Sequence, residues 1–182
     1  MRETKSIEFK AEVTDTFLKT VSAYSNYGSD IIYFGIDDDG SVKGIDCPKF
    51  KCLEIENLIN ANIDPKPDYT LQIDEKTNVI TLTVEEGLHK PYFYKNKAYK
   101  RNDSSTIEVD RLELTRLVLE GQNLSYEELK TKNQDLTFRT LEDKLKKVLS
   151  IQQINVDVLK TLELYSDTNG YNNAAALLSD TN

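Results

Sequence analysis

Residues 31–40 read IIYFGIDDDG, an unbroken apolar and aromatic run followed by three aspartates and a glycine. Such a run predicts a central β-strand over residues 31–36, because a strand covered on both faces lacks the polar alternation of a surface strand. Asp38, Asp39 and Gly40 predict a tight turn directly after it. Residues 42–45 predict the strand that returns from this turn. The chain is therefore expected to fold around a sheet.

Strand and helix patterns flank this central strand on both sides. Ile7 and Phe9 alternate with Glu8 and Lys10, which predicts a half-buried strand. Apolar residues at helical spacing predict helices over residues 17–24, 50–63 and 109–121, and alternation predicts hairpins over 69–84 and 92–100. The expected fold class is α+β, with a mixed, mostly antiparallel sheet and packed helices.

A chain of 182 residues is long enough for one full domain and part of a second. The first domain is expected to span residues 1–122. Residues 123–182 are expected to form a helical extension and the start of a truncated downstream domain, since helical spacing recurs over 138–149 and 154–162. A turn is expected at 167–170, before the apolar stretch 174–178.

Composition predicts a globular protein of the cytoplasm. The hydrophobic fraction is 38% and the charged fraction 30%, as in ordinary folded domains. No run approaches the roughly 20 apolar residues of a membrane helix, and the first residues are charged where a secretory peptide would be apolar. Cys47 and Cys52 are the only cysteines, so we expect reduced thiols. Together with His89 they would make a three-ligand zinc site at unusual spacing, which we do not favour.

Three acidic residues, Glu3, Glu8 and Asp38, are candidate metal ligands. Asp38 follows the central strand at its C-terminal end, where α/β folds often place their sites. Carboxylates suit Mg²⁺ or Mn²⁺, which can clamp a phosphodiester and activate water, so the three together would make a catalytic nuclease site. A straight strand would put Glu3 and Glu8 on opposite faces, so this site requires a bend at residues 4–6. The alternative is that Glu8 pairs with Lys10 on a solvated strand face and Asp38 only makes a turn.

A segment rich in basic and aromatic residues spans 89–101. Basic side chains can hold phosphates and exposed aromatic rings can stack on bases, as in single-strand binders. The net charge of −8 requires such a surface to be a local patch. The candidates for nucleic-acid binding are Lys10, Lys90, Tyr92, Lys95, Lys97, Tyr99, Lys100 and Arg101. The alternative is that half of the aromatic residues are core and the lysines protect a sheet edge from aggregation.

Several motifs occur in a fixed order: ETKSIEFK at 3–10, SAYSNYG at 22–28, FGIDDDG at 34–40, KGI at 43–45, KPY at 90–92 and YKRNDSST at 99–106. Read together, they resemble the Schlafen-type AlbA-like domain over residues 2–120. Bacterial domains of this kind stand at the front of longer proteins described as transcriptional regulators or RecG-like ATPases. The resemblance therefore implies DNA or RNA as the partner and an ATPase-like domain downstream. In the animal Schlafen proteins the matching acidic positions form a metal-dependent endoribonuclease site, which implies Glu3, Glu8 and Asp38 as its equivalents.

Three functions follow as alternatives. The leading hypothesis is the nucleic-acid-binding domain of a transcriptional regulator, whose binding needs no cofactor. The first alternative is an endoribonuclease of Schlafen type that uses the three acids with Mg²⁺ or Mn²⁺. The second is an oligomerisation module, in which the sheet edges or the helices within 138–164 form a homodimer that never contacts nucleic acid.

Overall fold

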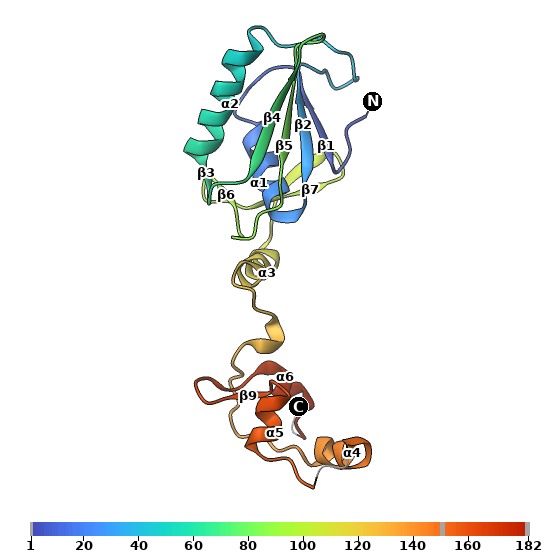
Figure 1. Ribbon diagram of the computed structural model, residues 1–182, viewed down its shortest axis with the longest axis vertical. Coiled ribbons are helices and arrows are strands. Elements are labelled where there is room, and N and C mark those ends of the chain that lie inside the picture. Colours follow the sequence, from blue (N-terminus) through green and yellow to red (C-terminus); the bar gives the residue numbers. More distant parts are fainter. Residues whose placement is uncertain (1, 150–151, 181–182) are drawn as a thin grey trace. The chain divides into compact units, whose positions relative to one another are not determined.

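The computed structural model describes residues 2–149 and 152–180. It divides into two compact units, Met1–Gln122 and Asn123–Asn182 (Figure 1). The first unit is built on a four-stranded sheet, and the second on short helices and a two-stranded hairpin. No helix among the described residues is both long enough and apolar enough to cross a bilayer.

The sheet of the first unit has the strand order β1-β2-β5-β4. These strands are β1 (Ile7–Lys10), β2 (Asp30–Phe34), β5 (Val79–Val84) and β4 (Tyr69–Asp74). β1 runs parallel to β2, whereas β5 pairs antiparallel with both of its neighbours. The expected mixed, mostly antiparallel sheet is confirmed. The register places Glu8 beside Ile32, so the two side chains point to the same face.

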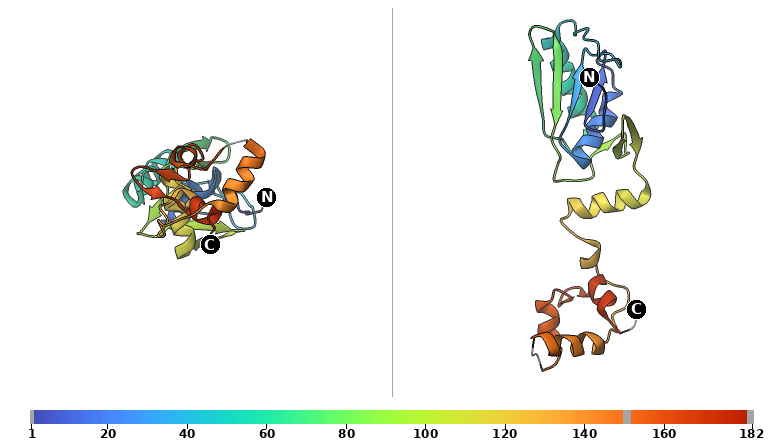
Figure 2. Two further views of the ribbon diagram at one scale, coloured as in Figure 1. Left: turned by 90° about the horizontal axis from the view of Figure 1, so that it is seen from below. Right: turned by 90° about the vertical axis from the view of Figure 1, so that its right-hand side faces the viewer.

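Two helices, α1 (Phe17–Tyr27) and α2 (Pro48–Asn62), cover one face of this sheet (Figure 2). Phe17 of α1 packs edge-on against Phe34 of β2, with ring centroids 5.2 Å apart. Ile59 of α2 is fully buried in the same core. Each large apolar side chain removed from water stabilises the fold by about 1.5–3 kcal/mol. The helices expected over 17–24 and 50–63 are confirmed.

Four further short strands and a helix complete the first unit. β3 (Ile63–Asp64) pairs with β6 (Phe93–Tyr94), and β7 (Tyr99–Asn102) pairs with β8 (Ser105–Glu108). The hairpin expected over 92–100 is therefore wrong beyond its turn, where Tyr94 and Lys97 exchange backbone hydrogen bonds of 2.9 and 3.0 Å. The two strands diverge because each finds another partner. Asp110 then caps α3 (Arg111–Gly121) by accepting from the Glu113 amide.

The strand expected over residues 42–45 does not form. Only Ile36 and Val42 make a bridge, after which the amides of Lys43 and Gly44 both donate to the Gly35 carbonyl, at 2.8 and 2.9 Å. Gly44 has a φ of +75°, and a Cβ there would lie 2.4 Å from the carbonyl oxygen of Thr77. The segment turns sharply against the β4–β5 turn, which excludes a ladder.

The second unit contains more than the helices expected from its sequence. Its elements are the 3-10 helix η1 (Tyr126–Glu128), α4 (Arg139–Leu149), α5 (Val156–Thr161), β9 (Tyr165–Ser166), β10 (Gly170–Tyr171) and α6 (Asn173–Leu178). The turn expected at 167–170 joins β9 to β10 in an antiparallel hairpin. A small core that includes Phe138 and Leu159 holds this unit together.

Candidate functional site

Glu8 is a buried carboxylate that is held between two cations. Its Oε2 accepts from Nη1 of Arg101 on β7, and its Oε1 lies 2.5 Å from Nζ of Lys10. Arg101 also donates to Thr106 Oγ1 at 2.9 Å and to the Thr4 carbonyl at 3.0 Å. The expected pairing of Glu8 with Lys10 is present, but the strand face is buried rather than solvated, since only 8% of the Glu8 side chain is exposed. Glu8 therefore ties β1 to the β7–β8 hairpin.

The bend required at residues 4–6 is present. Thr4 and Ile7 form an antiparallel bridge with backbone hydrogen bonds of 3.0 and 3.4 Å, so the chain turns at Lys5. The turn returns Glu3 to β1, where its carboxylate accepts from the Phe9 amide at 2.9 Å. Asp38, by contrast, lies exposed in the turn after β2. The turn is closed by a hydrogen bond from the Gly40 amide to the Asp37 carbonyl.

These carboxylates do not form a preformed metal site. Within residues 2–149 and 152–180, no group of three His, Cys, Asp or Glu side chains could hold a metal ion. Both oxygens of Glu8 already face a cation, so a divalent ion would have to displace Arg101 or Lys10. The three acids as placed here do not fit Mg²⁺ or Mn²⁺.

Each basic residue among the candidates forms an ion pair with a carboxylate. The distance from the lysine Nζ to the nearest carboxylate oxygen is 2.5 Å for Lys90 and Glu86, 2.7 Å for Lys97 and Glu108, and 3.5 Å for Lys95 and Asp15. Lys100 pairs with Glu113. Exposed pairs of this kind contribute about 0–1 kcal/mol, so Lys95 and Lys97 can exchange a carboxylate for a phosphate at little cost. Lys90 and Arg101 cannot do so freely, because their side chains are only 12% and 3% exposed.

The two tyrosines expected to stack on bases belong to the core. Tyr92 is 2% exposed and Tyr99 is 7% exposed, so neither ring is available to a base, and that expectation is corrected. Asn26 of α1 fixes Tyr92 by accepting from its amide at 2.8 Å and donating to its carbonyl at 3.0 Å. The alternative, that part of the aromatic segment is core, holds for these residues.

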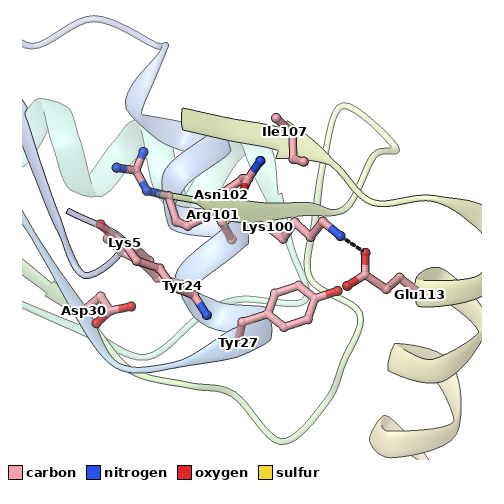
Figure 3. Close-up of a pocket in the computed structure, with 10 residues that line it drawn as sticks. Lys5, Tyr24, Tyr27, Asp30, Lys100, Arg101, Asn102, Ile107 and Glu113 are labelled. Carbon is pink, nitrogen blue, oxygen red and sulfur yellow. Dashed lines mark hydrogen bonds and ion pairs between the residues drawn. The ribbon is translucent and has the colours of Figure 1, made fainter. Parts of the chain in front are cut away.

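A pocket of about 360 Å³ lies beside β7 (Figure 3). The Thr4–Ile7 turn, the end of α1, the start of β2, β7, β8 and α3 all contribute to it. The polar residues that line it are Lys5, Tyr24, Tyr27, Asp30, Lys100, Arg101, Asn102 and Glu113. Lys5 is exposed and makes no ion pair within the described part of the chain. The pocket therefore brings together three cations, those of Lys5, Lys100 and Arg101, with two carboxylates and an amide.

Two tyrosines of α1 line this pocket in different electrostatic environments. Burial, and then the negative charge of Glu113, raises the pKa of Tyr27 to about 12. Burial likewise raises the pKa of Tyr24 well above its ordinary value, with Arg101 opposing that rise. Both phenols are therefore neutral hydrogen-bonding groups at neutral pH.

Comparison with known families places this geometry in context. Residues 3–110 match the family described as Schlafen, AlbA_2. The chain belongs to the Schlafen AlbA_2 family. No curated protein sequence matches it. The match covers more than half of the chain and includes every pocket residue named above except Glu113, so the pocket lies largely within the matched region.

Two solved structures resemble the Schlafen chain. The DIP2311 protein from Corynebacterium diphtheriae has a TM-score of 0.50 and 17% identity, over 95% of this chain and 35% of that chain. The N-terminal domain of a RecG-related protein from Nitrosomonas europaea has a TM-score of 0.43 and 21% identity, over 61% of this chain and 85% of that chain. This chain thus spans about a third of the length of the DIP2311 protein. At 17% identity the likeness to the DIP2311 protein concerns the fold alone.

Sequence reasoning about the Schlafen domain missed the pocket. Lys5, Tyr27 and Asn102 each stand in one of the ordered motifs, so the motifs held the signal. Which members of those motifs converge depends on the Thr4–Ile7 turn and on the β7–β8 pairing. Neither is visible as a local periodicity.

Proposed function

We propose that this chain is a nucleic-acid-binding domain that contacts phosphates at the rim of the pocket. The observation that carries the proposal is the position of Lys5, which is exposed without an ion-pair partner in the described structure. Lys100 and Asn102 lie around the same pocket and supply further donors to phosphate oxygens. Family membership supports the proposal, since the Schlafen AlbA-like resemblance implies DNA or RNA as the partner.

Electrostatics limits the contact to a small area. The formal net charge is −8, so most of the surface repels a phosphate backbone. Lysines whose carboxylate partners are exposed can change partner at low cost. Lys95 and Lys97, with side chains 65% and 53% exposed, are of this kind and can add phosphate contacts. Binding that depends on a few such contacts falls steeply with salt.

The test is fluorescence anisotropy of the full chain with labelled RNA and DNA, single-stranded and duplex, over a salt series. Lys5→Ala is expected to weaken binding to every nucleic acid that binds and to reduce the salt slope by about one. Lys76→Ala, in the exposed β4–β5 turn at the other end of the sheet, is the charge-matched control and should bind as wild type. Absence of binding at low salt, or an equal loss in both variants, would remove the proposal.

The ribonuclease remains a prediction from the family resemblance. The same complexes incubated with Mn²⁺ and run on a denaturing gel test it. Because both oxygens of Glu8 are engaged by cations, the RNA is expected to stay intact. If the wild type cleaves RNA and Glu8→Gln abolishes cleavage while retaining the fold, the ribonuclease becomes the assigned function in place of the binding domain. The roles of transcriptional regulator and homodimer also remain predictions, and sedimentation over a concentration series tests the second.

A further inference from the structure

The side chains that line the pocket beside β7 include both donors and acceptors of hydrogen bonds. Lys5, Lys100 and Asn102 are donors, whereas Asp30 and Glu113 are only acceptors, and Lys100 and Glu113 are already paired with each other. A phosphate backbone accepts hydrogen bonds but donates none, so it satisfies the first set and is repelled by the second. A nucleotide carries both kinds of group, because its phosphate accepts and the amino group of its base donates to a carboxylate.

The walls of the pocket also suit the flat face of a base. Tyr27 is 36% exposed and Ile107 is 38% exposed, and both side chains line the pocket. Figure 3 shows the Tyr27 ring beside the Lys100–Glu113 pair, and Ile107 lies on β8, where it pairs with Lys100 of β7. Unpaired bases stack on aromatic side chains in proteins that bind single strands. At about 360 Å³, the pocket lies near the lower limit of small-ligand sites, about 300 Å³, which corresponds to one nucleotide rather than a helix.

Two residues that line the pocket carry a buried polar atom without a hydrogen-bond partner among the described residues. Tyr24 Oη and Arg101 Nε are buried and make no hydrogen bond. Tyr24 is 1% exposed and Arg101 is 7% exposed, and both residues line this pocket. Buried polar groups in native proteins are nearly always hydrogen-bonded, so these two unpartnered atoms of pocket-lining residues need an explanation. Neither atom is exposed to the pocket, so a ligand would reach them only if these side chains moved.

We infer that the pocket binds a single unpaired nucleotide, with its phosphate toward Lys5, its base on Tyr27 and the amino group of the base at Asp30 or Glu113. This rests on the proposed function and adds a preference for unpaired strands. In a duplex the bases are stacked on one another, so only its phosphates reach the pocket. The nucleotide can come from a strand or from a free mononucleotide.

The experiment compares a labelled single strand of RNA with the same strand annealed to its complement, using the full chain. Wild type is expected to prefer the single strand. Tyr27→Ala is expected to weaken single-strand binding about tenfold, because a stacked base contributes strongly to affinity, and to leave duplex binding unchanged. Tyr27→Phe keeps the ring and should bind as wild type. Tyr126→Ala removes a tyrosine of the second unit that is 63% exposed and is the matched control.

Competition with adenosine 5′-monophosphate separates the two sources of the nucleotide. If the mononucleotide displaces the strand from wild type but not from Tyr27→Ala, the pocket binds a free nucleotide. If the mononucleotide does not displace the strand, the pocket binds a nucleotide within a strand. The inference is overturned if Tyr27→Ala binds strand and mononucleotide as wild type does. If Lys5→Ala still weakens binding in that case, the proposed function stands without the inference, whereas no binding of any nucleic acid removes both.

Discussion

Arg101 of β7 donates a hydrogen bond to Glu8 of β1, 93 positions earlier in the chain, and both side chains are almost completely buried. The pair joins the first strand of the sheet to a hairpin outside it. Because the pair is shielded from water, removing one partner leaves a charge in a poorly solvated environment. This arrangement favours a structural role for Glu8.

Arg101→Ala is expected to lower the free energy of unfolding by about 3–5 kcal/mol, because Glu8 is then buried without its main partner. Urea denaturation followed by circular dichroism measures the change. The double variant Glu8→Gln/Arg101→Ala should recover part of the loss, since no buried charge remains. Arg111→Ala, at an exposed position, is the control and should stay within about 0.5 kcal/mol of wild type. Equal urea midpoints of unfolding for Arg101→Ala and Arg111→Ala would contradict a structural role for the Glu8–Arg101 pair.

Asn26→Ala should destabilise the first unit through a single orphaned amide. Asn26 bonds both the amide and the carbonyl of Tyr92, but Ser22 also donates to that carbonyl at 2.7 Å. Only the Tyr92 amide therefore loses its partner, which costs about 1–3 kcal/mol when the group is buried. The same urea titration measures it, with the exposed Asn60→Ala as the control. If Asn60→Ala lowers the free energy of unfolding as much as Asn26→Ala does, the hydrogen bonds from Asn26 to the Tyr92 backbone are not the cause of the loss.

Tyr27 should ionise at a higher pH than an ordinary tyrosine, and Glu113 should be one cause of this shift. Burial and the Glu113 carboxylate raise the pKa of Tyr27 to about 12 from its ordinary value of 10.0. The neutral phenol is thus favoured by folding, so its stabilising contribution is complete below pH 10 and is lost as the pH rises toward 12. Ultraviolet titration of tyrosinate should show a lower pKa for Tyr27 in Glu113→Gln. Glu54→Gln on α2 should leave it unchanged, and the same pKa in both variants would exclude the effect of Glu113.

Asp180 should hold the start of α4 only while it is ionised. Its carboxylate accepts from the amides of Arg139 at 2.7 Å and Thr140 at 2.9 Å. These hydrogen bonds hold the pKa of Asp180 far below its ordinary value of 3.8. The contribution to stability is therefore present above pH 3.8 and is lost as the pH falls through the lower pKa of the folded state.

Asp180→Asn tests this helix cap at neutral pH. The amides of Arg139 and Thr140 are expected to exchange with solvent faster, as measured by hydrogen exchange with NMR detection, because the amide side chain is a weaker acceptor than the carboxylate. Asp143→Asn, exposed on the same helix, is the matched control. Unchanged exchange in Asp180→Asn would show that α4 begins without this contact.

The sequence predicted those elements whose pattern repeats within one strand or helix. The alternation in β1, the apolar run of β2 and the spacing in α1 each reflect burial of one face or both. The ordered motifs also indicated the family. The bend at residues 4–6 followed from a geometric requirement, namely that Glu3 and Glu8 converge in a metal site. The turn is present, although no such site forms among the described residues. Local periodicity, motif order and strand geometry were sufficient for these conclusions.

The tertiary structure alone decided which side chains meet. Tyr92 and Tyr99 follow the same alternation as surface aromatics, yet both are buried, because they pack into one core with α1. The burial of Glu8 depends on Arg101, and the pocket depends on residues from six separate segments. Local sequence carries the preference of each residue for helix, strand or turn. Burial, ion pairing and the pocket depend on contacts between segments far apart in the chain, and those exist only once the chain has folded.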